Sequence, residues 1–335
     1  MKISKNYRDI LLQLEHDARQ SFTDIGRAVG TSQQTVSYAV DTMREDGVIR
    51  DVYPLFDYTR FGYNGYVTLF RVNTFSREKL EELVDMFREH EMVAWVNRLA
   101  GGWDLLVFFL APNASYFNKA FKELVAEHPE QLRTYRILTS VVVHDMGRGY
   151  LGDAGMGEGL EDIIVGGDRT VLDLSDADEA TARHLYRNPL ASSVAMGEAM
   201  DVTAKTVIDR IERLEERNLV KGYRPLVGVQ ELGITASLLF IDYTKHDVEQ
   251  EDALVDYCKA HPNVTLLMKT FGDWDVMLRV EAGDREQARD AVRSIREQFE
   301  EIVLDYDALE ILDDVTKRYL PPGFFEDEAL VPLEE

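Results

Sequence analysis

The chain has 335 residues, a hydrophobic fraction of 45%, a net charge of −24 and a single cysteine, Cys258. This length predicts two or more domains, and one cysteine excludes an internal disulfide and a thiolate-rich metal site. Because no apolar run reaches the ~18 residues of a membrane-spanning helix and the N-terminus lacks the apolar core of a signal peptide, we expect a cytoplasmic protein.

Three short helices are predicted at the start of the chain, over residues 6–19, 23–29 and 32–46. In the third, Val36, Val40 and Met43 recur at helical spacing and form one apolar stripe. Ser32 is placed to cap this helix, and Gly47 is placed to end it. The tight break at residues 30–31 between the second and third helices predicts a helix-turn-helix, with the third helix as the recognition helix.

The next segments alternate between strand and helix patterns. We expect Val48 to Tyr53 to form a strand that Pro54 ends. Four more strands and two helices follow in the order β-α-β-β-α-β, which is the order of a ferredoxin-like sandwich with a four-stranded antiparallel sheet. Their predicted ranges are 63–72, 77–89, 93–99, 103–110, 116–126 and 132–143.

Two stretches look unable to pack. Residues 147–167 contain eight glycines with Asp and Glu between them, which predicts a flexible tether. Residues 321–335 begin with Pro-Pro-Gly and end acidic, which predicts a loose tail.

The same pattern occurs twice, at an offset of 171 residues and without gaps over about 140 residues. Gly101-Gly-Trp-Asp104 matches Gly272-Asp-Trp-Asp275, and Asn218 stands where the first copy has Gly47. The repeat predicts helices over 176–187, 192–200, 203–217, 248–260 and 285–298, and strands over 234–243, 264–270, 274–281 and 302–312.

We therefore predict an α+β chain that holds two copies of a winged helix-turn-helix followed by a ferredoxin-like sandwich. The predicted parts are a helix-turn-helix domain at 1–52, a ferredoxin-like domain at 53–146, a linker at 147–170, a second helix-turn-helix domain at 171–223, a second ferredoxin-like domain at 224–320 and a tail at 321–335.

The local charge decides whether the helical modules can approach phosphates. Residues 1–50 hold seven Lys and Arg against seven Asp and Glu, and residues 171–222 hold seven against ten, so most of the negative charge lies elsewhere. Polar residues off the apolar stripes of the two recognition helices are the candidate DNA contacts, since such side chains can pair with base edges or phosphates. They are Gln33, Gln34, Tyr38 and Thr42 in the first copy, and Lys205, Thr206, Arg210 and Arg213 in the second. The alternative is that these are solvated helix faces.

The order and spacing of several short phrases, found twice, resemble the leucine-responsive/asparagine regulator family, Lrp/AsnC. The phrases are Asp24-Ile-Gly-Arg-Ala-Val-Gly-Thr-Ser32, Glu45-Asp-Gly-Val-Ile49, Leu214-Glu-Glu-Arg-Asn-Leu-Val220 and the two Gly-x-Trp-Asp turns. The resemblance implies a DNA-binding domain joined to a ligand-sensing domain that dimerises through its sheets and often binds an amino acid between protomers. Family members usually carry one module, so this chain resembles a covalent pseudo-dimer, and pairing with a second chain stays open.

The Gly-x-Trp-Asp turns are the candidate effector sites. Asp104 and Asp275 can accept hydrogen bonds from an ammonium group, and glycine lets the backbone approach a ligand. The candidate residues are Gly101, Gly102, Asp104, Gly272, Asp273 and Asp275. The alternative is a tight turn whose Trp packs in a core or an interface. His90 and His261, which follow matched helices, are interpreted as structural.

These observations predict a sequence-specific DNA-binding transcriptional regulator and not an enzyme. No His-x-x-x-His, Cys pair, Gly-x-Ser-x-Gly or phosphate loop is present, so we predict no metal, no cofactor and no catalytic residue. Two alternatives stay open. One is a tetrapyrrole-modifying decarboxylase of the siroheme type, since some such proteins resemble this fold. The other is a small-molecule-binding or scaffold protein that does not bind DNA.

Overall fold

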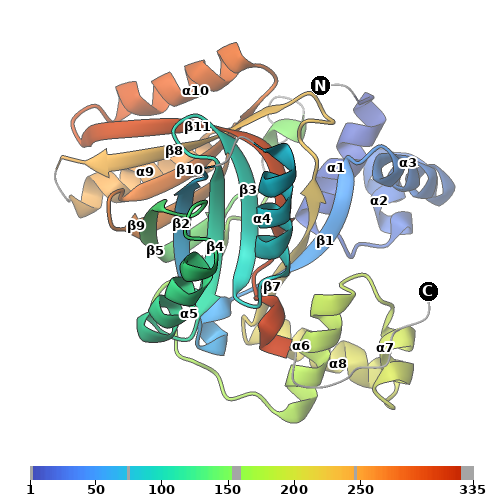
Figure 1. Cartoon of the computed structure of the whole chain (residues 1–335). Helices are drawn as coiled ribbons and strands as arrows, with labels where there is room; N and C mark the ends of the chain where they lie inside the picture. The colour runs from blue at the N-terminus through green and yellow to red at the C-terminus, as the bar shows by residue number, and fades with distance from the viewer. Residues whose placement is uncertain (1–2, 74–75, 153–159, 245–246, 326–335) are drawn as a thin grey trace.

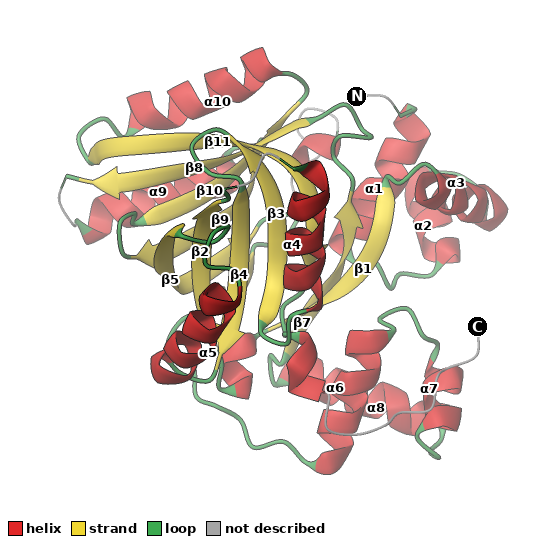
Figure 2. Ribbon diagram, viewed as in Figure 1, coloured by secondary structure: helices red, strands yellow, loops and turns green. Residues whose placement is uncertain are grey.

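The computed structural model describes the chain except residues 1–2, 74–75, 153–159, 245–246 and 326–335. Two three-helix units lie beside one large antiparallel sheet, whose helices cover its outer faces (Figures 1 and 2). The first half contains α1 (Lys5–His16), α2 (Phe22–Val29), α3 (Gln33–Glu45), β1 (Ile49–Phe56), β2 (Asn64–Arg71), α4 (Arg77–Glu89), β3 (Val93–Ala100), β4 (Leu105–Ala111), α5 (Ala114–Glu127) and β5 (Thr134–Asp145).

The second half follows the same order after β6 (Ile163–Gly166). It contains α6 (Asp176–Arg187), α7 (Ser193–Ala199), α8 (Ala204–Glu216), β7 (Val220–Val227), β8 (Thr235–Tyr243), α9 (Val248–Ala260), β9 (Val264–Phe271), β10 (Val276–Ala282), α10 (Arg285–Gln298) and β11 (Val303–Lys317). Short 3₁₀ turns lie at Tyr58–Phe61, Gly149–Leu151 and Pro322–Phe325.

The helix ends form where the side chains predict them. The Ser32 hydroxyl accepts the Thr35 backbone N–H at 3.1 Å, as expected for a cap. Gly47 and Asn218, which are equivalent in the repeat, both have positive φ, 72° and 57°, so each ends its helix in the left-handed conformation.

Two long strands, β5 and β11, each pair with strands of both halves. The sequence predicted two separate four-stranded sheets and did not predict this connection. The first part of β5 pairs with β2 of its own half, and residues 139–145 pair with β9 of the other half. In the same way β11 pairs first with β8 and then, over 310–317, with β3. The pairings close a ring in the order β2-β4-β3-β11-β8-β10-β9-β5, back to β2, which we call the eight-stranded ring. The boundary expected at 146 therefore does not separate two sheets, and one of the core clusters also contains buried residues from both halves.

A second, two-stranded sheet ties the helical units together. β1 pairs antiparallel with β7, from Ile49 opposite Val227 to Phe56 opposite Val220. The expectation that Pro54 ends β1 is wrong, since Pro54 lies within the strand opposite Tyr223. A two-stranded sheet has only edge strands, where the missing N–H of proline is tolerated.

The flexible tether expected at 147–167 is also wrong for the part that the structure describes. β6 adds to β5, with Val142 opposite Gly166 and Asp145 opposite Ile163, and Leu151 is fully buried. The apolar run Ile163-Ile-Val165 forms the strand. The prediction missed it because it rested on the glycine content of the whole segment. Residues 153–159 lie outside the described residues.

The prediction of a loose tail at 321–335 is wrong for residues 321–325. Phe325 is 1% exposed, and its ring lies 5.1 Å from that of Tyr186 and 4.7 Å from that of Phe324. Residues 321–325 therefore pack on α6, while the rest of the predicted tail, 326–335, lies outside the described residues.

Gly26 allows α2 to approach the turn before α3. A Cβ added there would lie 2.8 Å from the carbonyl oxygen of Thr31, and one added at the equivalent Gly197 would lie 2.7 Å from that of Val202. We expect Gly26→Ala to lower the free energy of unfolding by about 1–3 kcal/mol, because the turn must shift. Urea denaturation of this variant, with the exposed α2 variant Ala28→Ser as control, measures the effect. Equal stability of the two variants would contradict this packing.

Candidate functional site

The recognition helix of the first unit, α3, presents a polar face to solvent. Val36, Ala39, Val40 and Met43 are buried against α1 and α2, whereas Gln33 and Gln34 are exposed and Tyr38 is 70% exposed. Thr42 is half-buried and its hydroxyl donates to the backbone oxygen of Tyr38 at 2.9 Å. The structure therefore brings Gln33, Gln34 and Tyr38 together as an outward face and gives the Thr42 hydroxyl an internal partner.

The equivalent helix α8 carries a different surface. Lys205 is exposed, Arg210 is half-buried, and the Thr206 hydroxyl shares a 2.8 Å hydrogen bond with that of Thr203. Asp209 and Glu212 are also exposed on this helix. The two recognition helices therefore present different side chains to a DNA duplex: the candidate contacts on α3 are uncharged polar groups, and α8 carries charged groups of both signs.

Arg213 of α8 already has an anionic partner inside its own unit. Its guanidinium is hydrogen-bonded to the buried carboxylate of Asp178 on α6, which also receives Arg217 at 3.1 Å. Burial raises the pKa of Asp178, but hydrogen bonds from Arg213 and Ser175 outweigh it, and the net pKa lies below its usual value. A phosphate would have to compete with this carboxylate for Arg213. Ser175 and Asp178 also form a capping box at the start of α6, which the sequence reading did not identify.

The two Gly-x-Trp-Asp turns are matched in structure. Asp104 accepts the backbone N–H of Val72 at 2.7 Å, and Asp275 accepts that of Tyr243 at 2.8 Å. Each carboxylate thus ties its turn to the end of the neighbouring strand, β2 or β8. Asp273 forms an ion pair with Arg136 at 2.9 Å, and both are more than half exposed. An effector contact at these residues stays a prediction.

The glycines of these turns face the other half of the chain. Gly101 and Gly272 have φ of 128° and 147°. A Cβ at Gly101 would lie 3.0 Å from Leu309 of β11, and one at Gly272 would lie 2.9 Å from Leu138 of β5. Gly102 contributes its carbonyl oxygen to Arg71 Nε at 2.9 Å. Each turn therefore packs on the closing strand of the opposite half.

His90 and His261 have matched structural partners. Nδ1 of His90 accepts the backbone N–H of Met92 at 3.1 Å, and Nδ1 of His261 accepts that of Asn263 at 3.2 Å. Burial is the main cause that lowers the pKa of both rings. These contacts support the structural interpretation.

A buried ionic cluster inside the eight-stranded ring was missed by the sequence reading. Arg279 on β10 donates to both oxygens of Asp314 on β11, at 2.5 and 2.8 Å, and its Nε donates to Glu281 at 2.6 Å. Asn97 of β3 donates to the same Asp314 carboxylate at 2.6 Å. Because Leu278 and Val280 pack in the core under α10, Arg279 and Glu281 lie on the opposite, ring-facing side of β10.

The cluster reaches the first helical unit. Arg148, just after β5, contacts Glu281 at 3.0 Å and Glu15 of α1 at 2.6 Å, and the Tyr150 hydroxyl donates to Glu281 at 2.5 Å. Glu15 and Glu281 are 0% exposed. The segment expected to be a tether therefore connects α1 to the ring.

A second set of contacts surrounds Asp145 at the end of β5. Its carboxylate accepts Lys317 at 2.7 Å, the Tyr319 hydroxyl at 2.6 Å, and Arg224 of β7. Burial raises the pKa of Asp145, but the charges of Lys317 and Arg224 outweigh it and the pKa lies well below its usual value. Together the cluster holds four carboxylates and four cations, and each cation has a carboxylate partner: Glu15, Asp145, Glu281 and Asp314 with Arg148, Arg224, Arg279 and Lys317.

The comparison with known proteins supports a winged helix-turn-helix at the N-terminus most directly. Residues 3–50 match the family model described as winged helix-turn-helix DNA-binding. An uncharacterised HTH-type transcriptional regulator of Pyrococcus furiosus is 20% identical over 127 residues, which are 38% of this chain and 82% of that protein.

Solved structures are similar over different lengths. The siroheme decarboxylase NirDL is similar over 94% of both chains, with a TM-score of 0.58 and 14% identity. An AsnC family transcriptional regulator from Agrobacterium tumefaciens has a TM-score of 0.36 and 24% identity, over 41% of this chain and 90% of that chain. At this identity the NirDL likeness shows a shared fold.

The class of protein follows from the helical unit. With α1, α2, α3 and β1 in place and the match over 3–50, the N-terminal region is a winged helix-turn-helix of the DNA-binding type, and such a domain is characteristic of a DNA-binding transcriptional regulator. Among the described residues, no helix has the length and apolar character that crossing a bilayer requires.

Proposed function

We propose that the protein is a transcriptional regulator that recognises duplex DNA through α3. The observation that carries the proposal is the outward face of Gln33, Gln34 and Tyr38 on the second helix of a winged helix-turn-helix. Glutamine amides can pair with adenine edges in the major groove. The exposed tyrosine can add contacts to bases or phosphates.

The proposal includes a tandem arrangement of two unequal modules. The repeated element order and the 171-residue offset favour one module written twice. Since α8 has exposed Asp209 and Glu212 and commits Arg213 to Asp178, we assign base recognition to α3 and at most phosphate contact, through Lys205 and Arg210, to α8. The recognised site would then be asymmetric rather than palindromic.

An enzyme of the tetrapyrrole type is the second candidate, because the NirDL fold extends over nearly the whole chain. That protein has also been solved with an iron-uroporphyrin III analogue. A polycarboxylate ligand needs unpaired cations, whereas every cation of the buried cluster is matched by a carboxylate. This charge pairing disfavours a polycarboxylate at the buried cluster, and for that site it favours the regulator.

One pair of measurements separates the two candidates. The whole chain is incubated with fragmented genomic DNA at 50 and 200 mM salt and analysed by electrophoretic shift, and in parallel with the iron-uroporphyrin III analogue by absorbance near the Soret band. We expect shifted DNA that weakens steeply with salt and an unchanged tetrapyrrole spectrum. A stoichiometric spectral change without any DNA shift would reject the regulator hypothesis in favour of the enzyme hypothesis.

A further inference from the structure

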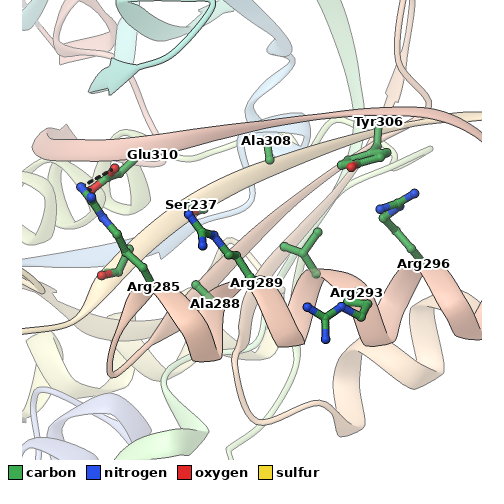
Figure 3. Close-up of a pocket in the computed structure, with 11 residues that line it drawn as sticks. Ser237, Arg285, Ala288, Arg289, Arg293, Arg296, Tyr306, Ala308 and Glu310 are labelled. Carbon is green, nitrogen blue, oxygen red and sulfur yellow. Dashed lines mark hydrogen bonds and ion pairs between the residues drawn. The ribbon is translucent and has the colours of Figure 1, made fainter.

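A groove lies between α10 and the outer face of β8 and β11, far along the chain from α3. It has a volume of about 490 Å³, within the roughly 300–1,000 Å³ of small-molecule sites. Figure 3 shows the helix on one side and the strands on the other. The lining residues are Thr235, Ser237, Arg285, Ala288, Arg289, Val292, Arg293, Arg296, Tyr306, Ala308 and Glu310.

The groove concentrates positive charge in an acidic chain. Four of its lining residues are arginines from α10, and Glu310 is its one carboxylate. Arg285 pairs with Glu310 at 3.1 Å and Arg293 pairs with Asp290 at 3.0 Å. Arg289 is exposed, makes no ion pair with any residue that the structure describes, and points from α10 toward Ser237 (Figure 3).

Arg296 adds a cation beside an aromatic ring. Its guanidinium carbon lies 3.8 Å from the centroid of the Tyr306 ring, and its Nε is buried without a hydrogen-bond partner within the described part of the chain. Ala288 and Val292 on α10 and Ala308 on β11 give the two sides of the groove apolar surface. The groove therefore offers guanidinium donors beside apolar side chains.

In the first half of the chain, aromatic side chains fill the space that corresponds to this groove. At the equivalent positions it has Tyr66 for Ser237, Phe117 for Ala288 and Phe121 for Val292. The Tyr66 and Phe117 rings stack with centroids 4.1 Å apart, and Phe121 packs on Tyr135, the equivalent of Tyr306, at 4.9 Å. Three large rings in one half are thus replaced by three small side chains in the other, which opens the groove.

The charges differ between the halves at the same positions. Where α10 has its four groove arginines, α5 has one cation, Lys122. The equivalents of Arg285, Arg289, Arg293 and Arg296 are Ala114, Asn118, Lys122 and Val125. Small residues and arginines therefore occur together, in one half only, as a ligand site for an anion would require.

From this geometry we propose that the groove binds a small phosphorylated ring compound of the nucleotide class. Phosphate oxygens accept the charge-assisted hydrogen bonds that guanidinium groups donate, with Arg289 and Arg296 as the principal donors. The ring would lie between Ala288 and Val292 of α10 on one side and Ala308 of β11 on the other, beside Tyr306. This ligand would be an effector, and its binding does not depend on whether α3 recognises DNA.

Isothermal titration of the full chain with ADP, adenosine and inorganic phosphate tests the proposal. We expect ADP to bind, inorganic phosphate to bind more weakly and adenosine to bind least. Arg289→Ala should weaken ADP binding roughly tenfold, since a hydrogen bond to a charged group is lost. The matched variant in the other half, Lys122→Ala, should leave ADP binding unchanged.

A second variant restores the packing of the first half. Ala288→Phe combined with Val292→Phe should fill the groove and abolish ADP binding, while circular dichroism shows a folded chain. Absence of ADP binding to the wild-type chain, equal binding of ADP and adenosine, or full ADP binding by the folded double variant would each overturn the proposal. None of these results bears on the electrophoretic shift of DNA, so the two proposals fail independently.

Discussion

Replacing Asp314 by alanine is expected to lower the free energy of unfolding by about 3–5 kcal/mol, because both terminal nitrogens of the buried Arg279 guanidinium lose their acceptor and only Nε keeps one, Glu281. Asp314 is 4% exposed and accepts two hydrogen bonds from Arg279 and one from Asn97. Urea denaturation measures the change.

The adjacent residue provides a matched control. Asp313 is paired with Arg50 at 2.5 Å, and both side chains are about one-third exposed, so Asp313→Ala should cost less than about 1 kcal/mol. If the two variants lose equal stability, the ionic cluster does not hold the ring together as described.

The same cluster predicts loss of stability in acid. Burial raises the pKa of Glu281 and of Asp314, but their arginine partners outweigh it and both pKa values lie below their usual range. These carboxylates therefore stabilise the fold fully above the unfolded pKa of about 4, and the contribution is lost as the pH falls through that value toward the folded pKa. Urea midpoints between pH 6 and pH 3 should fall more steeply for the wild-type chain than for Asp314→Ala. Parallel curves would show that Asp314 contributes nothing to the acid sensitivity.

The second large effect is expected on DNA. Gln34→Ala combined with Tyr38→Ala should weaken binding of a preferred duplex roughly 10- to 100-fold, since a bidentate base contact contributes about 1–3 kcal/mol. Both side chains are exposed, so the folded state should keep its stability. Fluorescence anisotropy with a labelled duplex measures the loss.

A double variant of α8 is the control for this effect. Lys205→Ala with Arg210→Ala should weaken preferred and random duplexes alike and reduce the salt dependence, because phosphate contacts carry no sequence information. A larger loss of sequence preference in the α8 variant than in the α3 variant would reverse the assignment of the recognition helix.

The sequence predicted the order and type of the helices and strands because those features are local. The apolar stripe of α3, the Ser32 cap and the positive φ at Asn218 each depend on a few neighbouring residues. The partners that β5 and β11 find in the opposite half, β9 and β3, lie more than 120 positions away, and no local pattern encodes these pairings. The exchange of strands between the halves was missed for this reason, whereas β6 was missed because the glycines around it outweighed its short apolar run.

The buried cluster and the groove did leave a signal in the repeat itself. Arg279 and Glu281 stand where the first half has the buried Phe108 and Leu110, and a charge at a core position indicates a buried ion pair or a site. Likewise Ala288 stands where the first half has Phe117. Comparing the two halves position by position for chemistry, rather than for similarity, would have identified both regions.

The specificity ratio of the intact chain measures whether the protein recognises a DNA sequence. A duplex enriched from genomic fragments by the whole chain is compared with a random duplex of equal length in an anisotropy titration at 150 mM salt. We expect the enriched duplex to bind at least about 1,000-fold more tightly and Gln34→Ala to reduce this ratio. A ratio near one for the wild-type chain would contradict the claim that this protein recognises DNA sequence.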